Sequence, residues 1–549
     1  MGTVRFASRL ESGGLGSTTR RVSAFLALMW LLQAGQIGAA EQPSPLVTRV
    51  GVEYALAGHA AAFAETGIPA VKYIPDAYSW GNMQPSAEAA VDFSVTDRYV
   101  REFQQAGFVE LVLALRSKSS WASVDCGWLA CDQPQPKPEY LDLYEQWVEA
   151  VVERYDGDGV DDLPELLRPV SILEIGTELS SYEPEVVGDY LAMLERAHRA
   201  AHRAFPGVQV AHAAILVTTA FREHPTPDEY EAAFAAVAPR IMAHSLADIR
   251  AVLDRPELFE LVNFHALGDP GEIEDTVAWL EWEMAQRGYE RPIIISDTAT
   301  TPFIAWGAAT RCTGPVGQLG IVVPPATEND RCRLADFFTL LVNADPETLE
   351  WTHAFVGEDL VKKVMVATER GVLLIDTWST EDIPIATLPA FQAGAGMGAW
   401  AGMVEATANL FTGERVVHGR RPAFYALQQV MSHLGPATTI RRLDQEDPRL
   451  RVYELGSDES ARWVAWLDAG VLLLPDDPVP SAALTLTTEP GTVLVESLVT
   501  RPDQTAPDRL YLVSDGELEI TVTPSPSFVV APAPVPSPRR PGGRHQGAG

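Results

Sequence analysis

The feature that most constrains the fold of this chain is an eightfold alternation of strand-like and helix-like segments. The apolar, strand-like segments are 47–54, 69–75, 108–115, 171–178, 208–216, 259–265, 292–296 and 372–377. Helix-like segments lie between them and after the last, at 55–66, 94–106, 141–155, 186–204, 230–253, 273–287, 358–369 and 422–434. Eight units of this kind favour a closed parallel barrel over an open sheet. We therefore predict an α/β fold, a (β/α)8 TIM barrel.

Two of the strand-like segments lead into an acidic residue. The fourth ends on Glu178, and the seventh is followed by Asp297. A carboxylate at the end of a buried strand faces whatever lies above the sheet, and the fourth and seventh strands of a barrel lie on different sides of its mouth. Paired carboxylates are the usual means of breaking a glycosidic bond, because one protonates the departing oxygen while the other attacks the sugar carbon or activates water.

Beyond about Gly435 the pattern changes to short strands separated by Pro, Asp and Gly. These segments are 450–455, 462–467, 482–488, 493–499, 510–513 and 518–522, and they indicate a small antiparallel β-sandwich. We divide the chain into a signal peptide at 1–40, a barrel at 41–435, a sandwich at 436–530 and a disordered tail rich in Pro, Gly and Arg at 531–549. An insertion from Thr298 to about Glu350 is expected to shape one wall of the cleft.

The first 40 residues have the features of an export signal. Arg20 and Arg21 precede an apolar run from Val22 to Leu32, and small residues at Gly38-Ala39-Ala40 offer a cleavage site. The run is short for a membrane span, and the phenylalanine is misplaced for a twin-arginine signal. We expect general secretion of a periplasmic or extracellular protein, with no stable membrane insertion after cleavage. An uncleaved anchor is the alternative.

The four cysteines fit an oxidising compartment. Cys126 lies close to Cys131, while Cys312 and Cys332 enclose one long loop. Pairing within each of these couples is favoured among the three connectivities that four cysteines allow. A zinc site is the alternative, although the spacing is not of the metal-binding type and no histidines flank the cysteines.

Charge and motifs exclude several classes of function. The formal net charge of −33 should repel nucleic acid and anionic membranes. The sequence contains no Gly-x-Ser-x-Gly elbow, Walker loop, dinucleotide-binding fingerprint or His-Glu-x-x-His motif. No metal or organic cofactor is implied.

Several short motifs follow one another over residues 47–530. They are Val71-Lys72-Tyr73 with Trp80 and Gln84-Pro85, Ala106-Gly107-Phe108, Ser120-Trp121-Ala122, the run from Glu153 to Gly159, Phe264-His265, and the run from Arg420 to Tyr425. In this order they resemble the clan A glycoside hydrolases, the (β/α)8 retaining glycosidases. The chain looks closest to the β-xylosidase and α-iduronidase type with an appended β-sandwich.

The resemblance implies that Glu178 is the general acid/base and Asp297 the nucleophile. Two positions depart from the family pattern, because Thr177 stands where Asn usually precedes the acid/base and Asp297 stands where the nucleophile is usually Glu. The missing methylene withdraws the carboxylate by about 1.5 Å. Such a change is enough to move a pair from the retaining separation of about 5–5.5 Å to the inverting range of about 6.5–9.5 Å.

Other residues are candidates for binding the substrate, each with a structural alternative. They are Thr177, His265, Trp378, Tyr182, Arg116 and Trp80. His265 is expected to orient Asp297 or bind a sugar hydroxyl, Arg116 to keep the nucleophile ionised, and Trp378 to stack on a sugar. Glu174 shares a strand face with Glu178.

The resulting hypothesis is an exported glycosidase acting on an oligo- or polysaccharide. The alternative is a catalytically silent, carbohydrate-binding barrel. Which sugar and anomer are recognised, and the oligomeric state, are left open by the sequence.

Overall fold

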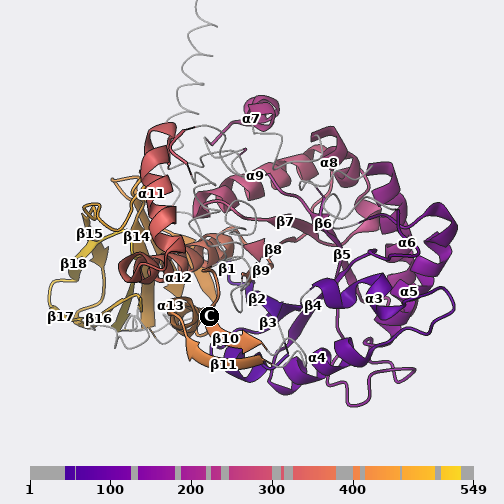
Figure 1. The fold of residues 1–549 in the computed structure, drawn as a ribbon. Helices are drawn as coiled ribbons and strands as arrows, with labels where there is room; N and C mark the ends of the chain where they lie inside the picture. The colour runs from indigo at the N-terminus through magenta and orange to yellow at the C-terminus, as the bar shows by residue number, and fades with distance from the viewer. Residues whose placement is uncertain are drawn as a thin grey trace, which may run out of the picture. The chain divides into compact units, whose positions relative to one another are not determined.

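The computed structural model describes residues 44–55, 57–73, 75–124, 134–179, 187–217, 220, 224–236, 246–298, 311–313, 326–378, 400–408, 415–457, 460–500 and 509–532 (Figure 1). The signal peptide expected at 1–40 and residues 533–549 of the expected tail lie outside the described residues, whereas Ala531 and Pro532 belong to strand β19 (Ser527–Pro532) and not to a tail. Within the described residues, no helix is both long and apolar enough to cross a membrane.

Eight parallel strands form the predicted barrel. They are β2 (Arg49–Ala55), β3 (Ala70–Tyr73), β4 (Glu110–Leu115), β5 (Ile172–Glu178), β6 (Gln209–Ala214), β7 (Val262–His265), β8 (Ile293–Thr298) and β9 (Leu374–Thr377). The hydrogen-bonded order is β6-β5-β4-β3-β2-β9-β8-β7. The two edge strands also meet, because Ala211 bridges to Leu261 and Ile215 to Phe264 in parallel. The ring is thus closed, and each of the eight predicted strands is confirmed.

Helices surround these strands in Figure 1. They are α2 (Ala60–Ala64), α3 (Trp80–Met83), α4 (Ser94–Gln105), α5 (Leu141–Glu153), α6 (Val187–Ala204), α7 (Tyr230–Ala236), α8 (Leu246–Leu253), α9 (Pro270–Gln286), α12 (Pro346–Glu369) and α13 (Pro422–Leu434). The first helix is shorter than predicted. α12 begins well before the predicted residue 358, because Asp345 caps it by accepting a hydrogen bond from the Thr348 amide and Pro346 supplies a preformed first turn. The insertion also contains α11 (Arg331–Val342).

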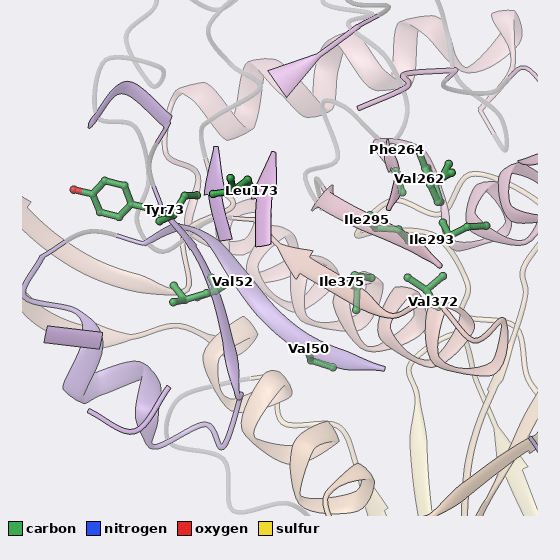
Figure 2. Close-up of a cluster of buried hydrophobic side chains, with 14 of the residues drawn as sticks. Val50, Val52, Tyr73, Leu173, Val262, Phe264, Ile293, Ile295, Val372 and Ile375 are labelled. Carbon is green, nitrogen blue, oxygen red and sulfur yellow. The ribbon is translucent and has the colours of Figure 1, made fainter. Parts of the chain in front are cut away.

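The outward faces of the strands pack against the helices. Figure 2 shows part of this apolar cluster, with labelled side chains that come from six barrel strands and from Val372, two residues before β9. The labelled residues are Val50, Val52, Tyr73, Leu173, Val262, Phe264, Ile293, Ile295, Val372 and Ile375. Because side chains alternate along a strand, their neighbours in sequence point into the barrel.

The barrel interior is arranged in layers. An apolar layer takes one residue from each of seven strands: Ala70, Val112, Ile172, Ala211, Leu261, Ile294 and Leu374. Gly51 of β2 pairs with Ala70, and a Cβ atom at Gly51 would collide with the Asp376 carboxylate. Two residues farther along the strands, the next layer is polar. Its members are Glu53, Lys72, Glu174, Asn263, Ser296 and Asp376, all nearly inaccessible to solvent.

The C-terminal part is the predicted antiparallel sandwich. It contains β12 (Thr439–Arg442), β13 (Leu450–Gly456), β14 (Ser460–Leu467), β15 (Ala482–Thr487), β16 (Gly491–Ser497), β17 (Arg509–Val513), β18 (Glu517–Val522) and β19 (Ser527–Pro532). One sheet has the order β1-β12-β13-β14-β19-β16-β17, and β15 pairs with β18 in a second sheet. β1 (Ser44–Pro45) precedes the barrel in sequence and yet pairs with β12. A hairpin, β10 (Val404–Ala408) and β11 (Arg415–Arg420), leads into α13.

One of the two favoured disulfides lies within the described residues. Cys312 is joined to Cys332. Cys126 and Cys131 lie outside the described residues.

Candidate functional site

The two predicted acids meet at the carboxyl ends of β5 and β8. Their positions depend on irregularities in both strands. Between the pairs Ile175–His212 and Glu178–Ala214, two residues of β5 oppose one of β6, and Gly176 takes a φ of 88° there. In β8 the register slips before Asp297. Such bulges redirect side chains at the ends of strands.

His265, at the end of β7, connects the two acids. Its Nδ1 atom lies 3.0 Å from Oε1 of Glu178 and 4.0 Å from Oδ2 of Asp297. Both distances are measured from the same atom, Nδ1 of His265. The Glu178 and Asp297 oxygens can therefore be no farther apart than the sum of 3.0 and 4.0 Å. Nε2 of His265 lies 3.1 Å from Oγ of Ser296. With Nδ1 protonated, the ring donates to Glu178 and accepts from the Ser296 hydroxyl.

A buried lysine stands below the acids. Nζ of Lys72 lies 3.0 Å from Glu53 Oε1 and 2.8 Å from Glu174 Oε2, and it donates to the Ser296 carbonyl at 3.0 Å. The Lys72 side chain is fully buried, which is costly for a charge unless it is paired in this way. Glu174 therefore belongs to an ion pair inside the barrel, with Lys72 as its partner. Oε1 of Glu174 also lies 3.9 Å from Nε2 of His265.

The carboxyl groups of Glu53 and Asp297 are close enough for each to shift the pKa of the other. Two carboxyl groups can share a hydrogen bond only if one of them is protonated. Burial raises the pKa of Glu53 well above its ordinary value, and the neighbouring Asp297 charge adds to that shift. Of the two carboxyl groups, Glu53 is therefore the one that burial favours most strongly in its protonated form.

Asp297 itself titrates close to neutrality. Burial raises its pKa to about 6, and the charges of Glu178 and Glu174 act in the same direction. The hydrogen bond from Glu53 and the charge of Lys72 limit the rise. Lys72 is a cation whose charge lowers the pKa of this carboxyl group, and the role of Arg116 toward Asp297 stays a prediction.

The remaining predicted residues divide into two groups. Thr177, Arg116 and Trp378 lie around the acids. Nη2 of Arg116 lies 3.5 Å from the Thr177 hydroxyl, and both residues are buried. Trp378 packs against Tyr54, with ring centroids 5.8 Å apart, and against Leu267. Tyr54 is itself close enough to feel the charges of Glu53 and Asp297, which together with burial raise its pKa.

Trp80 does not join this group. Trp80 has no exposed surface, and its ring packs on Trp121, Tyr144 and Trp147. Its Nε1 atom donates to Gln84 at 2.9 Å, so its function is to fill the core between β3 and α5. Tyr182 lies outside the described residues.

Sequence reasoning missed Glu53, Lys72 and Tyr54. Glu53 and Lys72 could have been found from the sequence. Each is a charged residue inside a short apolar strand, at a position where the alternation of side chains points into the barrel. The contact between Glu53 and Lys72 could not be predicted, because β2 and β3 come together only in the barrel.

Comparison with solved structures finds the same architecture in several proteins. One is a family 39 glycoside hydrolase from Bacteroides cellulosilyticus WH2, at 11% identity and a TM-score of 0.54, covering 89% of this chain and 81% of that one. Others are a glucosidase from Croceicoccus marinus (13% identity, TM-score 0.52) and a monomeric β-xylosidase from Caulobacter crescentus CB15 (12% identity, TM-score 0.52), each covering 90% of this chain and 98% of the other.

The chain has the fold of the clan A glycoside hydrolases. By sequence, no protein-family model and no curated protein matches it. At identities of 11–13% the likeness is one of fold. In that fold, the mouth formed by the carboxyl ends of the strands is where side chains from several strands converge, and here it holds Glu178, Asp297 and His265.

Proposed function

We propose that the protein is a glycoside hydrolase that cleaves O-glycosidic bonds of an oligo- or polysaccharide. Glu178 acts as the general acid/base, and Asp297 as the nucleophile or as the base that activates water. The observation that carries the proposal is the convergence of both carboxylates on one atom, Nδ1 of His265, at the mouth of the barrel. Two acids that flank one small space are what glycoside hydrolysis requires.

The surroundings suit the two acids to different tasks. A nucleophile or base must be ionised, and Lys72 and the Glu53 proton both favour the charged form of Asp297. Glu178 is slightly more exposed than Asp297, with 19% against 14% of its side chain accessible, and its Oε1 atom lies 3.0 Å from Nδ1 of His265. An acid/base has to exchange its proton during each cycle, and this exposure permits the exchange.

The separation of the acids favours retention of configuration. The upper limit set by the two contacts with His265, 3.0 and 4.0 Å, lies above the retaining separation of about 5–5.5 Å. Separations up to this limit overlap only the lowest part of the inverting range of about 6.5–9.5 Å. The bulge before Asp297 brings the shorter side chain forward, which offsets its missing methylene.

Export is part of the proposal. The disulfide between Cys312 and Cys332 supports an oxidising compartment, where such bonds form and persist. A polysaccharide-degrading enzyme also meets its polymeric substrate outside the cell.

The test is a panel of aryl glycosides and plant or microbial polysaccharides, assayed with the purified protein. On the substrate that is cleaved, Glu178→Gln should lower kcat/KM by about 10²–10⁴-fold, as expected for loss of a general acid. Asp297→Asn should lower it at least as much. The activity of the native protein should rise through about pH 6 as Asp297 ionises. Proton NMR of the first-formed product then gives the anomeric outcome.

A matched control is Asp275→Asn, which changes an acid on α9 that pairs with His224. This variant should cleave the substrate at the native rate. Cleavage that survives in the Glu178→Gln/Asp297→Asn double variant would exclude the proposal.

The second candidate function is carbohydrate binding without turnover. The observation in its favour is that Thr177 stands beside the acid/base and its hydroxyl lies next to Arg116, so the usual Asn amide is absent. Calorimetry should then detect saturable binding of an oligosaccharide that is never hydrolysed. In that case Asp297→Glu, which restores the family residue, is the variant in which to look for gained activity.

A further inference from the structure

Two histidines and a glutamate converge at the other end of the barrel. His198 and His202 are four residues apart on α6, so both side chains leave the same face of the helix. Glu260 precedes β7. Its Oε1 atom lies 3.1 Å from Nε2 of His198 and 3.3 Å from Nε2 of His202. The nitrogen and oxygen atoms concerned all lie within 4.8 Å of one another.

The two separations between the glutamate oxygen and the histidine nitrogens, 3.1 and 3.3 Å, are close to the edge of a tetrahedral zinc site. Zinc binds imidazole nitrogen at about 2.0–2.1 Å and carboxylate oxygen at about 2.0–2.2 Å, which puts neighbouring ligand atoms roughly 3.3–3.5 Å apart. Hydrogen bonding explains only part of the arrangement. Nε2 of His202 is buried, yet it has no hydrogen-bond partner with acceptable geometry even though Glu260 is 3.3 Å away. A metal ion placed among the three atoms would satisfy all of them.

The carboxylate is held in place by a second contact. Oε2 of Glu260 accepts a hydrogen bond from the Val210 amide at 2.9 Å, which leaves Oε1 directed at the histidines. Outer contacts of this kind orient metal ligands. Between 19% and 32% of the surface of the three side chains is exposed, so water can complete the coordination.

We propose that His198, His202 and Glu260 bind one divalent transition ion of the zinc class. Of the two groups of potential ligands among the described residues, this one supplies imidazole nitrogens, whereas the other, Glu153, Asp156 and Asp158, contains carboxylates alone. Imidazole nitrogen favours zinc and its neighbours over magnesium or calcium.

The position of the site indicates a structural function. Val210 lies at the beginning of β6, and Glu260 bonds to it through both backbone and side chain just before β7. The site is thus at the amino ends of the strands, opposite Glu178 and Asp297. At that end of a barrel, side chains serve stability rather than catalysis. The ion would fasten the last turns of α6 to the segment that enters β7.

The experiment uses the full-length protein, stripped with a chelator, dialysed and titrated with zinc chloride. We expect one zinc per chain by elemental analysis and a rise in Tm of about 2 °C or more at saturation. His202→Ala and Glu260→Gln should each weaken zinc binding by about 100-fold or more and abolish the zinc-dependent rise. Magnesium should not substitute.

His224→Ala is the matched control, because His224 is an exposed histidine that pairs with Asp275 elsewhere on the surface. It should bind zinc as the native chain does. For each variant, the Tm is compared with and without zinc, so a variant of lower stability is still informative. If His202→Ala does not fold, His198→Gln takes its place. No zinc binding by the native protein at micromolar concentration, or equal binding by the His202→Ala and His224→Ala variants, would overturn the proposal. Neither result depends on glycosidase activity.

Discussion

At the scale of single residues, the central feature is an excess of acids over bases inside the barrel. Lys72 is surrounded by Glu53, Glu174, Asp297 and Asp376, and its one positive charge cannot neutralise four carboxylates. Burial makes ionisation costly, so protons are retained instead. The pKa of Asp376, like that of Glu53, is raised well above its ordinary value by burial. The site is therefore stabilised most at low pH.

Asp297→Asn should show this directly in the free energy of unfolding. Because the folded-state pKa of Asp297 is raised to about 6, its contribution to stability is complete below the unfolded pKa of about 3.9 and is lost as the pH rises through about 6. Above that pH the asparagine variant should be the more stable protein, by on the order of 2 kcal/mol. At pH 4 the difference should vanish. Urea unfolding at pH 4 and pH 7.5 measures it.

The same difference at both pH values would show that Asp297 is not held near neutrality. Loss of activity in a protein that has become more stable would also separate a functional defect from misfolding.

At the scale of elements, the strand ends decide which side chains face the mouth. In regular alternation Ser296 points inward and Asp297 would point outward, toward the helices. The bulge in β8 brings both inward, so that Ser296 contacts His265 while Asp297 approaches Glu53. In β5 the bulge contains Gly176 and likewise changes which side chains of the strand end face inward. The glycine is required there because a side chain at a φ of 88° is strained.

Gly176→Ala should therefore damage both stability and activity. A left-handed backbone conformation costs a residue with a Cβ atom about 1–2 kcal/mol, and relief of that strain would move Glu178 away from His265. We expect a loss of about 1–2 kcal/mol in the free energy of urea unfolding, together with a lower kcat. Gly188→Ala is the control, because Gly188 lies in α6 with open space around it.

The control should be neutral or more stable by up to about 0.5–1 kcal/mol. If the two alanine variants behaved alike, the geometry of β5 at Gly176 would not be what positions Glu178.

At the scale of the molecule, the sandwich shares its core with the barrel. Tyr453 and Trp466 of the sandwich belong to the same buried cluster as the helices α12 and α13. β1 begins the described chain and pairs with β12. Glu274 of α9 binds Arg442 of β12, and at 3.0 Å it binds Arg451 of β13. Contacts of this extent should make the two parts unfold together.

Glu274→Ala tests this coupling. The substitution leaves Arg442 and Arg451 without a shared carboxylate in a place where Glu274 is only 18% exposed, so we expect a loss of about 1–2 kcal/mol. Unfolding should still be a single transition by calorimetry. Glu281→Ala is the control on the same helix, because Glu281 is 53% exposed and pairs with Arg370. Its effect should lie within about 0.5 kcal/mol.

Two separated transitions in the native protein would contradict the shared core. Equal effects of the Glu274→Ala and Glu281→Ala substitutions would show that the ion pairs of Glu274 contribute no more than ordinary surface pairs.

The barrel was predictable because its signal is local. Strand and helix periodicity repeats eight times, and each apolar strand such as β5 or β8 is recognisable from six or seven neighbouring residues. The acids at the ends of those two strands were predictable for the same reason. The structure also bears out the sandwich, whose short strands alternate between buried and exposed residues.

The site's inner contacts were not predictable, because they join residues from different strands. Nothing near Glu53 in the sequence indicates that it will meet Asp297, and nothing near Trp80 indicates that it will be buried rather than exposed at the mouth. The histidines of α6 carry a local signal in their spacing, but the glutamate that completes the group comes from the segment before β7.

The sequence by itself thus determined the architecture and the two strand ends that hold the acids, since periodicity and chain order suffice for both. Only the tertiary structure decided the orientation of those acids and the raised pKa of Asp297. Closing the barrel brings Lys72 and Glu53 close enough to shift the pKa of Asp297, and it places His265 3.0 Å from Glu178 and 4.0 Å from Asp297. The resulting desolvation and charge interactions do not exist in the extended chain.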